Sequence, residues 1–503
     1  MTTPISSKAG ASAVWVVSYI FFLLSLANNF SASHDSINYL NHIVKGEHLF
    51  HQHHLLYHFL ANRWLQLFGP LFSTVPQHYI VESFTAFWGS GTLAVCYLFF
   101  RNRFYLAPLV SALGVSVIAF SYGAWFYSVN VEVYTPPLFF LLTSLYVITR
   151  KAPRKNDIWL IALLHSLAIL FHQVNVLFGF VILQWIYVNR KNFPIGTSFL
   201  KYFITGFVIV GAVYFFIGWY VEGKDTIATF TDWILGYSVG HDYWRPLSAS
   251  TPLQVLTGFS RAFIGAHFIF QVPVVEGFLQ SSFRYHSLRD EIFLGSQLSS
   301  AMAWLLSAFA LVFGILLVSL VIRFARKVRS MRFHFHVLNP LLLCLLIYSL
   351  FFTFWMPEIL EFWILQMVIV WLIIIGMLPL IRFPFRLGAK SGLAVLALLL
   401  FVINYFGSMR WLQRLEYDWY YVEVKKLPGL QRGDLVIVEK QWILKDYVRY
   451  YTPATVIATD EPDFNAAETK MKVQEATAAD RKVYLYRSEP ATEKSGWQVI
   501  RSY

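Results

Sequence analysis

The sequence predicts an all-α polytopic membrane protein with about eleven transmembrane helices, followed by a small extracytoplasmic α/β domain. Of its 503 residues, 57% are hydrophobic and only 14% are charged, whereas soluble globular proteins carry roughly 25% charged residues. The deficit comes from uncharged apolar runs close to the roughly 20 residues that cross a bilayer core. Cys96 and Cys344 both lie inside such runs, so the sequence predicts no disulfide framework.

Apolar periodicity and its flanks place the expected membrane domain at residues 1–408. It includes two long outer loops, 32–77 and 220–296. The predicted spans are residues 12–31, 78–100, 105–122, 135–149, 158–171, 174–189, 199–219, 297–322, 337–355, 360–381 and 391–408. The apolar stretch 253–271 is predicted to lie at the interface or re-enter the membrane, because a crossing there would reverse the charge pattern that follows it.

Lysine and arginine fix the predicted orientation. Before residue 409, eighteen of them fall on the side that holds Lys8 and seven on the other side. Cytoplasmic loops are enriched in these residues, so we expect a cytoplasmic N-terminus in the inner (plasma) membrane and an extracytoplasmic C-terminal domain. This bias also explains the net charge of +12 without nucleic acid as a partner.

Acidic residues and histidines show the opposite bias. The outer side, or span ends that face it, holds thirteen acids before residue 409, and the cytoplasmic side holds Asp157 alone. Carboxylates near membrane-embedded aromatic residues are costly unless they are paired or hydrated. The sequence therefore predicts a functional site on the outer face.

The first outer loop reads as two amphipathic surface helices separated at Lys45-Gly46. Asp35 opens the first helix, and two readings stay open: a partly desolvated general base or a helix N-cap. In the second helix, His54 and His58 share one face. They could contact phosphate or substrate, hold a metal ion, or only make the surface polar. No zinc-type spacing is present, so no metal ligand is predicted and a divalent cation stays open.

Four stretches of sequence resemble one family of enzymes. HDSINY and HHLLYH in the first loop, NVEVYTPP at 130–137 and WMPEILEFW at 355–363, together with the layout of residues 10–408, resemble the GT-C superfamily of membrane glycosyltransferases. That superfamily includes the protein O-mannosyltransferases and the aminoarabinose transferase of lipid A. The resemblance implies an inverting transferase with a polyprenyl-phosphate sugar donor and an acidic general base at Asp35. His34 and Ser36 flank this acid where the family usually has a second acid, so the subfamily and the acceptor stay open.

Such a reaction also needs groups that bind the donor phosphate and the sugar. For the phosphate, the outer candidates are His54, His58, Arg63, Arg245 and Arg261, since arginine suits phosphate through its forked donors. The alternative for these arginines is snorkelling or pairing with a nearby acid. For substrate contact, the candidates are Glu132, Tyr134, His172 and Glu361, all beside span ends; each could instead serve local structure.

Residues 409–503 are predicted to form the soluble domain. Expected helices near 411–426, 442–451 and 466–478 are interspersed with strands at 434–439, 455–460, 482–487 and 497–501. Two other functions stay open for the whole chain. It could be a transporter or flippase for a lipid-linked glycan, although few charges lie at mid-membrane, or a non-catalytic assembly subunit.

Overall fold

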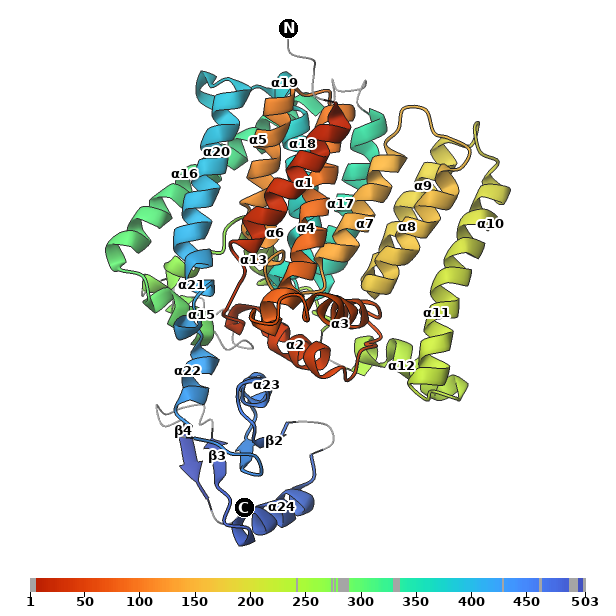
Figure 1. Ribbon diagram of the computed structural model, residues 1–503. Helices are drawn as coiled ribbons and strands as arrows, with labels where there is room; N and C mark the ends of the chain where they lie inside the picture. The colour runs from red at the N-terminus through yellow and green to blue at the C-terminus, as the bar shows by residue number, and fades with distance from the viewer. Residues whose placement is uncertain are drawn as a thin grey trace.

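The computed structural model describes residues 6–240, 243–272, 275, 277–278, 289–328, 335–427, 429–460, 464–487 and 496–500. Five residues that enter the charge comparison lie outside these ranges: Asp242, Glu276, Arg284, Arg329 and Arg332. Within them, the chain forms a helical bundle joined to a smaller unit that contains a sheet (Figure 1).

Apolar helices form the bundle. Five are long and apolar enough to cross a membrane, and six shorter apolar helices of 10–17 residues lie among the described residues. The long ones are α4 (Gln77–Asn102), Ile195–Val221 (α10 to η4), α16 (Ser300–Lys327), α17 (Phe335–Phe354) and Ala389–Leu412, which runs from α20 (Ala389–Asn404) to α21 (Arg410–Leu412). The shorter ones are α1 (Ser7–Leu23), α5 (Pro108–Ala119), α7 (Thr135–Ile148), α8 (Asp157–Phe171), Gln173–Val188 (η2 and α9) and Leu360–Gly376 (η8 and α18). Each overlaps a predicted span, although α1 begins and ends several residues before the predicted span 12–31.

Helix α18 (Ile364–Gly376) lies in the middle of the bundle because it is apolar on every side. Nearly all of its residues are buried, as expected for a helix without a polar face. The long helix α4 packs against α1, α5 and α7. A Cβ atom at Gly89 of α4 would overlap Ser128, so glycine permits this close approach.

The segment predicted as the first outer loop, residues 32–77, lies across one end of the bundle. Helices α2 (Asp35–Lys45) and α3 (Tyr57–Phe68) lie below the ends of α4 and α7 (Figure 1). Gly46 ends α2 with φ 71°, a left-handed conformation that glycine adopts without strain. The predicted break at Lys45-Gly46 is confirmed.

The segment predicted as the second outer loop, residues 220–296, contains α12 (Ile227–Gly240), α13 (Thr251–Phe263), η5 (His267–Gln271) and α15 (Arg289–Ser296) among its described residues. The predicted helix 253–271 is in fact two pieces, because Ala266 adopts φ 60° between them. Asn404 of α20 satisfies the broken backbone: its Nδ2 donates to the Phe263 carbonyl at 2.9 Å, and its Oδ1 accepts the Gly265 amide at 3.1 Å. Backbone amides and carbonyls that lose their helical partners need other hydrogen-bond partners where water is excluded.

The C-terminal unit contains one four-stranded sheet in the order β2-β1-β3-β4. Strands β1 (Leu435–Val438), β2 (Thr455–Ala458) and β3 (Val483–Arg487) are parallel neighbours, and β4 (Gly496–Val499) pairs antiparallel with β3. Its helices are α22 (Trp419–Lys425), α23 (Trp442–Tyr451) and α24 (Ala466–Ala478).

The prediction of one helix at 411–426 is wrong. Helix α21 ends at Leu412 and α22 begins at Trp419. Asp418 separates them: its Oδ1 caps α22 by accepting the Tyr421 amide at 3.1 Å. Its Oδ2 accepts the Phe30 amide at 2.9 Å and the Tyr447 hydroxyl at 2.5 Å. The same carboxylate therefore caps α22 and ties it both to the chain that follows α1, at Phe30, and to α23, at Tyr447.

We expect this carboxylate to contribute strongly to stability. Replacing Asp418, which is 0% exposed, by alanine leaves three buried donors without an acceptor, a loss of about 3 kcal/mol. The apparent thermal unfolding midpoint in detergent should fall by about 5 °C. Asp418→Asn should lie between, since its amide oxygen still accepts. The exposed Asp480→Asn serves as control, and an Asp418→Ala midpoint equal to that of the control would contradict the assignment.

Candidate functional site

A cavity of about 520 Å³ lies where the two segments predicted as outer loops meet the bundle. Its walls come from the start of α2, the loop 51–54, residues 127–134, the chain from α13 to η5, and residues 355–362. The C-terminal unit contributes Trp442, the first residue of α23. Segments that are far apart in the sequence thus line one cavity.

Asp35 lines this cavity as the first residue of α2. The residue before it, His34, has φ 49°, a sparsely populated conformation that is costly for a residue with a side chain. The alternative role of Asp35 as helix N-cap is wrong: the cap position is His34, and the Ser33 hydroxyl accepts the Ser36 amide at 3.1 Å. The Asp35 carboxylate instead accepts the Tyr39 hydroxyl at 3.4 Å.

Burial is the main influence on the Asp35 carboxyl. It raises the pKa of Asp35 to about 6, although the charge of His34 and the Tyr39 hydroxyl both act to lower it. Near neutral pH most of the group is therefore ionised, and it is a stronger base than an ordinary aspartate. A carboxylate of this kind can accept a proton from a bound hydroxyl or amine.

Two ion pairs link the cavity to α15. His34 Nε2 lies 2.9 Å from Asp290 Oδ2, and although burial lowers the pKa of His34, the charge of Asp290 raises it to about 9. Arg261 donates a hydrogen bond to Glu291. Burial raises the pKa of Glu291, but the Arg261 charge outweighs it and leaves this pKa below its usual value. Both cations are therefore held in place by neighbouring carboxylates of one helix.

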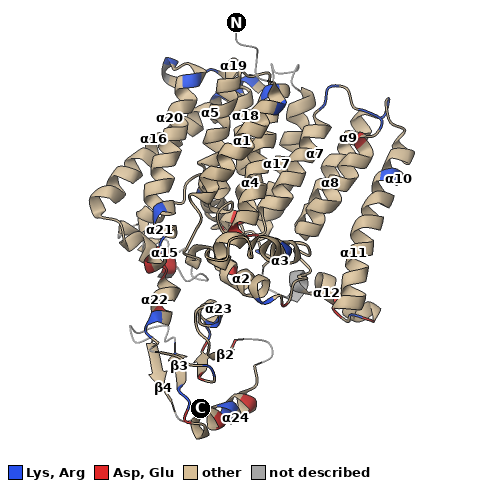
Figure 2. Cartoon of the chain, in the orientation of Figure 1, with Lys and Arg blue, Asp and Glu red and all other residues tan. Residues whose placement is uncertain are grey.

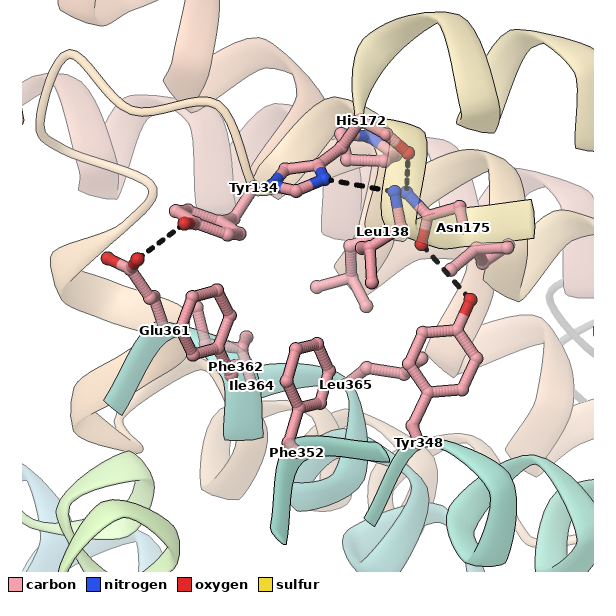
Figure 3. A pocket seen from close by; sticks show the side chains of 13 residues that line it. Tyr134, Leu138, His172, Asn175, Tyr348, Phe352, Glu361, Phe362, Ile364 and Leu365 are labelled. Atoms are coloured by element: carbon pink, nitrogen blue, oxygen red, sulfur yellow. Dashed lines mark hydrogen bonds between the residues drawn. The ribbon is translucent and has the colours of Figure 1, made fainter. Parts of the chain in front are cut away.

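Glu361 lies on the opposite wall and is held by two tyrosines. Tyr134 donates to its Oε1 at 2.5 Å, and Tyr127 donates to its Oε2 at 3.2 Å. Figure 3 shows the Tyr134 bond beside a smaller pocket of about 50 Å³. Tyr134, His172 and Glu361 line both spaces, and the small pocket continues among apolar side chains such as Leu138 and Phe352.

Glu132 lies behind this wall and does not line the cavity. It is 1% exposed; its Oε1 accepts the Ser36 hydroxyl at 3.4 Å and its Oε2 accepts the Val133 amide at 3.3 Å. Burial, followed by the charges of Glu361 and Asp35, raises the pKa of Glu132 well above its usual value. Burial therefore favours the protonated form of this carboxyl.

The other residues predicted to contact phosphate or substrate lie partly at the cavity wall and partly away from it. His54, His172 and Arg261 line the cavity, whereas His58 packs behind it against Tyr39, with ring centroids 4.8 Å apart. Two predicted arginines lie elsewhere. Arg63 is exposed and donates to Gln66 at 2.7 Å; Arg245 lies 4.0 Å from Glu358 and is not part of the cavity wall.

The described residues contain no group of three or more His, Cys, Asp and Glu side chains arranged to hold a metal ion. The His54–His58 pair predicted as one metal option thus lacks a third ligand there. We derive no step through a divalent cation.

Sequence reasoning missed several lining residues. Tyr39 follows Asp35 by four residues, so helical spacing could have indicated it. Glu291 and Trp442 gave no such signal, because they approach Asp35 only through the tertiary fold.

No protein-family model matches the sequence, and no curated protein is similar to it. Among solved structures, ArnT from Cupriavidus metallidurans bound to undecaprenyl phosphate matches with a TM-score of 0.54 and 11% identity, over 95% of this chain and 92% of that one. The chain has the fold of ArnT. The predicted resemblance to the GT-C glycosyltransferases is confirmed at the level of the fold.

Two further solved structures are less similar. ArnT in the apo state gives a TM-score of 0.43 at 12% identity, over 96% of this chain and 94% of that one. The S. cerevisiae protein O-mannosyltransferase Pmt1-Pmt2 complex bound to the sugar donor gives 0.33 at 16% identity. That match covers 48% of this chain and spans about a third (34%) of the other.

The contacts of Asp35 predict how its ionisation responds to substitution. Tyr39→Phe removes a hydrogen bond to the carboxylate and should raise the pKa of Asp35 above about 6. An infrared pH titration in detergent can follow the carboxyl C=O band, assigned by its loss in Asp35→Asn. The exposed Tyr105→Phe should leave the titration unchanged. A Tyr39→Phe curve that coincides with wild type would mean that the hydroxyl does not stabilise the carboxylate.

Proposed function

We propose that this protein is a membrane glycosyltransferase that moves a sugar from a polyprenyl-phosphate donor to an acceptor at the outer face of the membrane. The observation that carries the proposal is the cavity, where the Asp35 carboxylate and the Arg261 guanidinium line one space. The fold supports it, because ArnT was crystallised with undecaprenyl phosphate. The membrane part of the chain and its multi-pass apolar helices suit a donor whose lipid stays in the bilayer.

Asp35 is the proposed general base. Its pKa of about 6 leaves it ionised at neutral pH, whereas burial raises the pKa of Glu132 well above its usual value and Glu132 lies outside the cavity wall. The carboxylate would take the proton from the acceptor hydroxyl or amine as this group attacks the anomeric carbon. General-base catalysis of this kind contributes typically about 10²–10⁴-fold in rate.

Arg261 is the proposed phosphate ligand. As the bond between the anomeric carbon and the phosphate oxygen breaks, the electron pair goes to that oxygen and negative charge develops on the phosphate. A fixed guanidinium stabilises such charge better than mobile water does. Glu291 occupies part of the guanidinium and orients it, and the remaining N–H donors are available to phosphate.

A single displacement inverts the anomeric centre, because attack and departure occur on opposite faces of the sugar. No covalent sugar-enzyme intermediate is then needed. Glu361, held by Tyr127 and Tyr134, is proposed to contact the substrate rather than to accept the proton. The apolar small pocket beside it is proposed to take part of the substrate's apolar surface.

The proposed topology uses all eleven apolar helices as spans, with the N-terminus cytoplasmic and residues 409–503 outside, in the inner membrane. Figure 2 shows many of the Lys and Arg positions of the bundle along its end near the N-terminus, and Asp and Glu positions toward the end where α2 and α15 lie. This distribution follows the positive-inside rule. It supports an active site that opens to the outer face.

The decisive experiment is a transfer assay with the purified full-length chain in nanodiscs. A panel of undecaprenyl-phosphate sugars is offered with candidate acceptors, and wild type is compared with Asp35→Asn. We expect Asp35→Asn to lose at least about 100-fold in turnover while it still binds undecaprenyl phosphate. Wild-type kcat/KM should fall below about pH 6, as the base becomes protonated.

Glu132→Gln is the matched control, because burial favours the protonated form of this carboxyl and Glu132 does not line the cavity; this variant should keep most of the activity. Full activity of Asp35→Asn would remove Asp35 as the base. Movement of a lipid-linked sugar across liposomes by the same preparation, with no transfer to any acceptor, would replace the proposal by transport.

Arg261→Gln should weaken the phosphate interaction specifically. Loss of a charged hydrogen-bonding partner costs about 1.5–3 kcal/mol, so we expect the Kd for undecaprenyl phosphate to rise about 10- to 100-fold. Arg63→Gln, which changes an exposed arginine outside the cavity, should bind like wild type. Equal affinities of Arg261→Gln and Arg63→Gln would exclude Arg261 as a phosphate ligand.

A further inference from the structure

The His54 side chain is buried at the cavity wall with no hydrogen-bond partner among the described residues. It is 5% exposed, and both ring nitrogens, Nδ1 and Nε2, lack a partner there. Buried polar atoms in folded proteins nearly always have a partner, from the protein, from water or from a ligand. This ring therefore points to something that binds against it.

Aromatic and imidazole rings surround His54. Its ring stacks on His51 with centroids 4.3 Å apart and planes tilted by 15°, and it meets Tyr39 at 5.1 Å. His172 lies 6.3 Å away and packs on Tyr134 at 5.4 Å. Tyr39, His51, His54, Tyr134 and His172 all line the cavity, and we refer to these five residues as the imidazole wall.

The histidines of this wall carry no charge at neutral pH. Burial lowers the pKa of His172 to about 4 and that of His51 to about 3, and it lowers the pKa of His54 well below its usual value. His172 Nδ1 accepts the Val174 amide at 3.4 Å, so its proton lies on Nε2, a donor. A neutral imidazole offers one donor and one acceptor.

The uncharged imidazoles of this wall favour a sugar over a phosphate as the ligand. An uncharged wall gives a phosphate none of the charge stabilisation that Arg261 gives. A hydroxyl both donates and accepts, which matches a neutral imidazole, and a sugar ring presents several hydroxyls together with apolar C–H faces that suit packed aromatic rings. No three-ligand metal group exists among the described side chains.

We propose that the imidazole wall, with His54 at its centre, binds the hydroxyl groups of a sugar ring. The cavity then has a charged end at Arg261 for phosphate and an uncharged end for sugar, with Asp35 joined to the latter through Tyr39. This assignment rests on the proposed function for the reaction, but sugar binding itself can be measured without transfer. The sugar belongs either to the lipid donor or to the acceptor.

The test measures binding of two lipids to the full-length protein in nanodiscs: undecaprenyl phosphate, and undecaprenyl phosphate carrying glucose or mannose. We expect His54→Phe, which keeps a ring but no nitrogen, to weaken binding of the sugar-bearing lipid about 10-fold and to leave undecaprenyl phosphate unchanged. His54→Asn keeps a donor and an acceptor and should recover part of the loss. His42→Phe, a histidine outside the cavity wall, is the matched control.

A second arm identifies an acceptor sugar. Methyl glycosides of glucose, mannose, galactose and arabinose are tested by saturation-transfer NMR with undecaprenyl phosphate already bound. A wild-type signal that His54→Phe loses, with donor binding unchanged, assigns the wall to the acceptor. The proposal is overturned if His54→Phe changes neither arm, if it weakens both lipids equally, or if wild type shows no sugar-dependent binding in either arm. His54-dependent sugar binding without any transfer would instead sink the proposed function and leave this site standing.

Discussion

The position of the proposed base depends on one buried carboxylate far away in sequence. Asp418 Oδ2 accepts the amide of Phe30, and the Asn29 side chain donates to the Tyr417 carbonyl at 2.9 Å. These bonds join residues 29–30, which lie between α1 and α2, to residues 417–418, and the bonded residues are 388 positions apart in the sequence. Because Asp35 follows Phe30 by only five residues, these bonds limit where α2 can begin.

The C-terminal unit also holds α2 in position, through hydrogen bonds from α2 to α23. Asn38 donates to the Asp446 carboxylate at 3.0 Å, and Asn41 donates to the Asp446 carbonyl at 2.9 Å. Further along both helices, the like charges of Lys45 and Arg449 lie close enough to repel each other. These neighbours follow the same order in α2 and α23, so the first turns of both helices lie together. Trp442, the first residue of α23, therefore lines the same cavity as Asp35 and is 41% exposed.

Much of the bundle could be predicted from the sequence because hydropathy and length act locally. A run of apolar residues forms a helix in lipid whatever its neighbours are, so each predicted span overlaps an apolar helix, while the bounds of the first one are displaced. The location of Asp35 followed from its place after the first span. Its proposed capping role failed, since sequence does not distinguish a helix's cap from its first residue.

Contacts between segments that are far apart in the chain could not be predicted from the sequence. Arg63, Arg245 and Arg261 looked alike as outer arginines, and only the fold separates the one that lines the cavity. The broken helix at 263–266 depends on Asn404, which lies 141 positions away from Phe263. Neither periodicity nor spacing reports a partner at such a separation.

Helix α15 connects the two charged parts of the cavity. Its consecutive residues Asp290 and Glu291 pair with His34 and Arg261, one beside the base and the other at the proposed phosphate site. Without Glu291, the Arg261 guanidinium could turn toward another carboxylate of the cavity, and the proposed base and the proposed phosphate ligand would then neutralise one another. Because neighbouring residues of a helix hold a fixed spacing, α15 sets the spacing between His34, the residue before the proposed base, and Arg261, the proposed phosphate ligand. A displacement of α15 would move His34 and Arg261 together, so these two ion pairs would keep the proposed base and the proposed phosphate ligand in register.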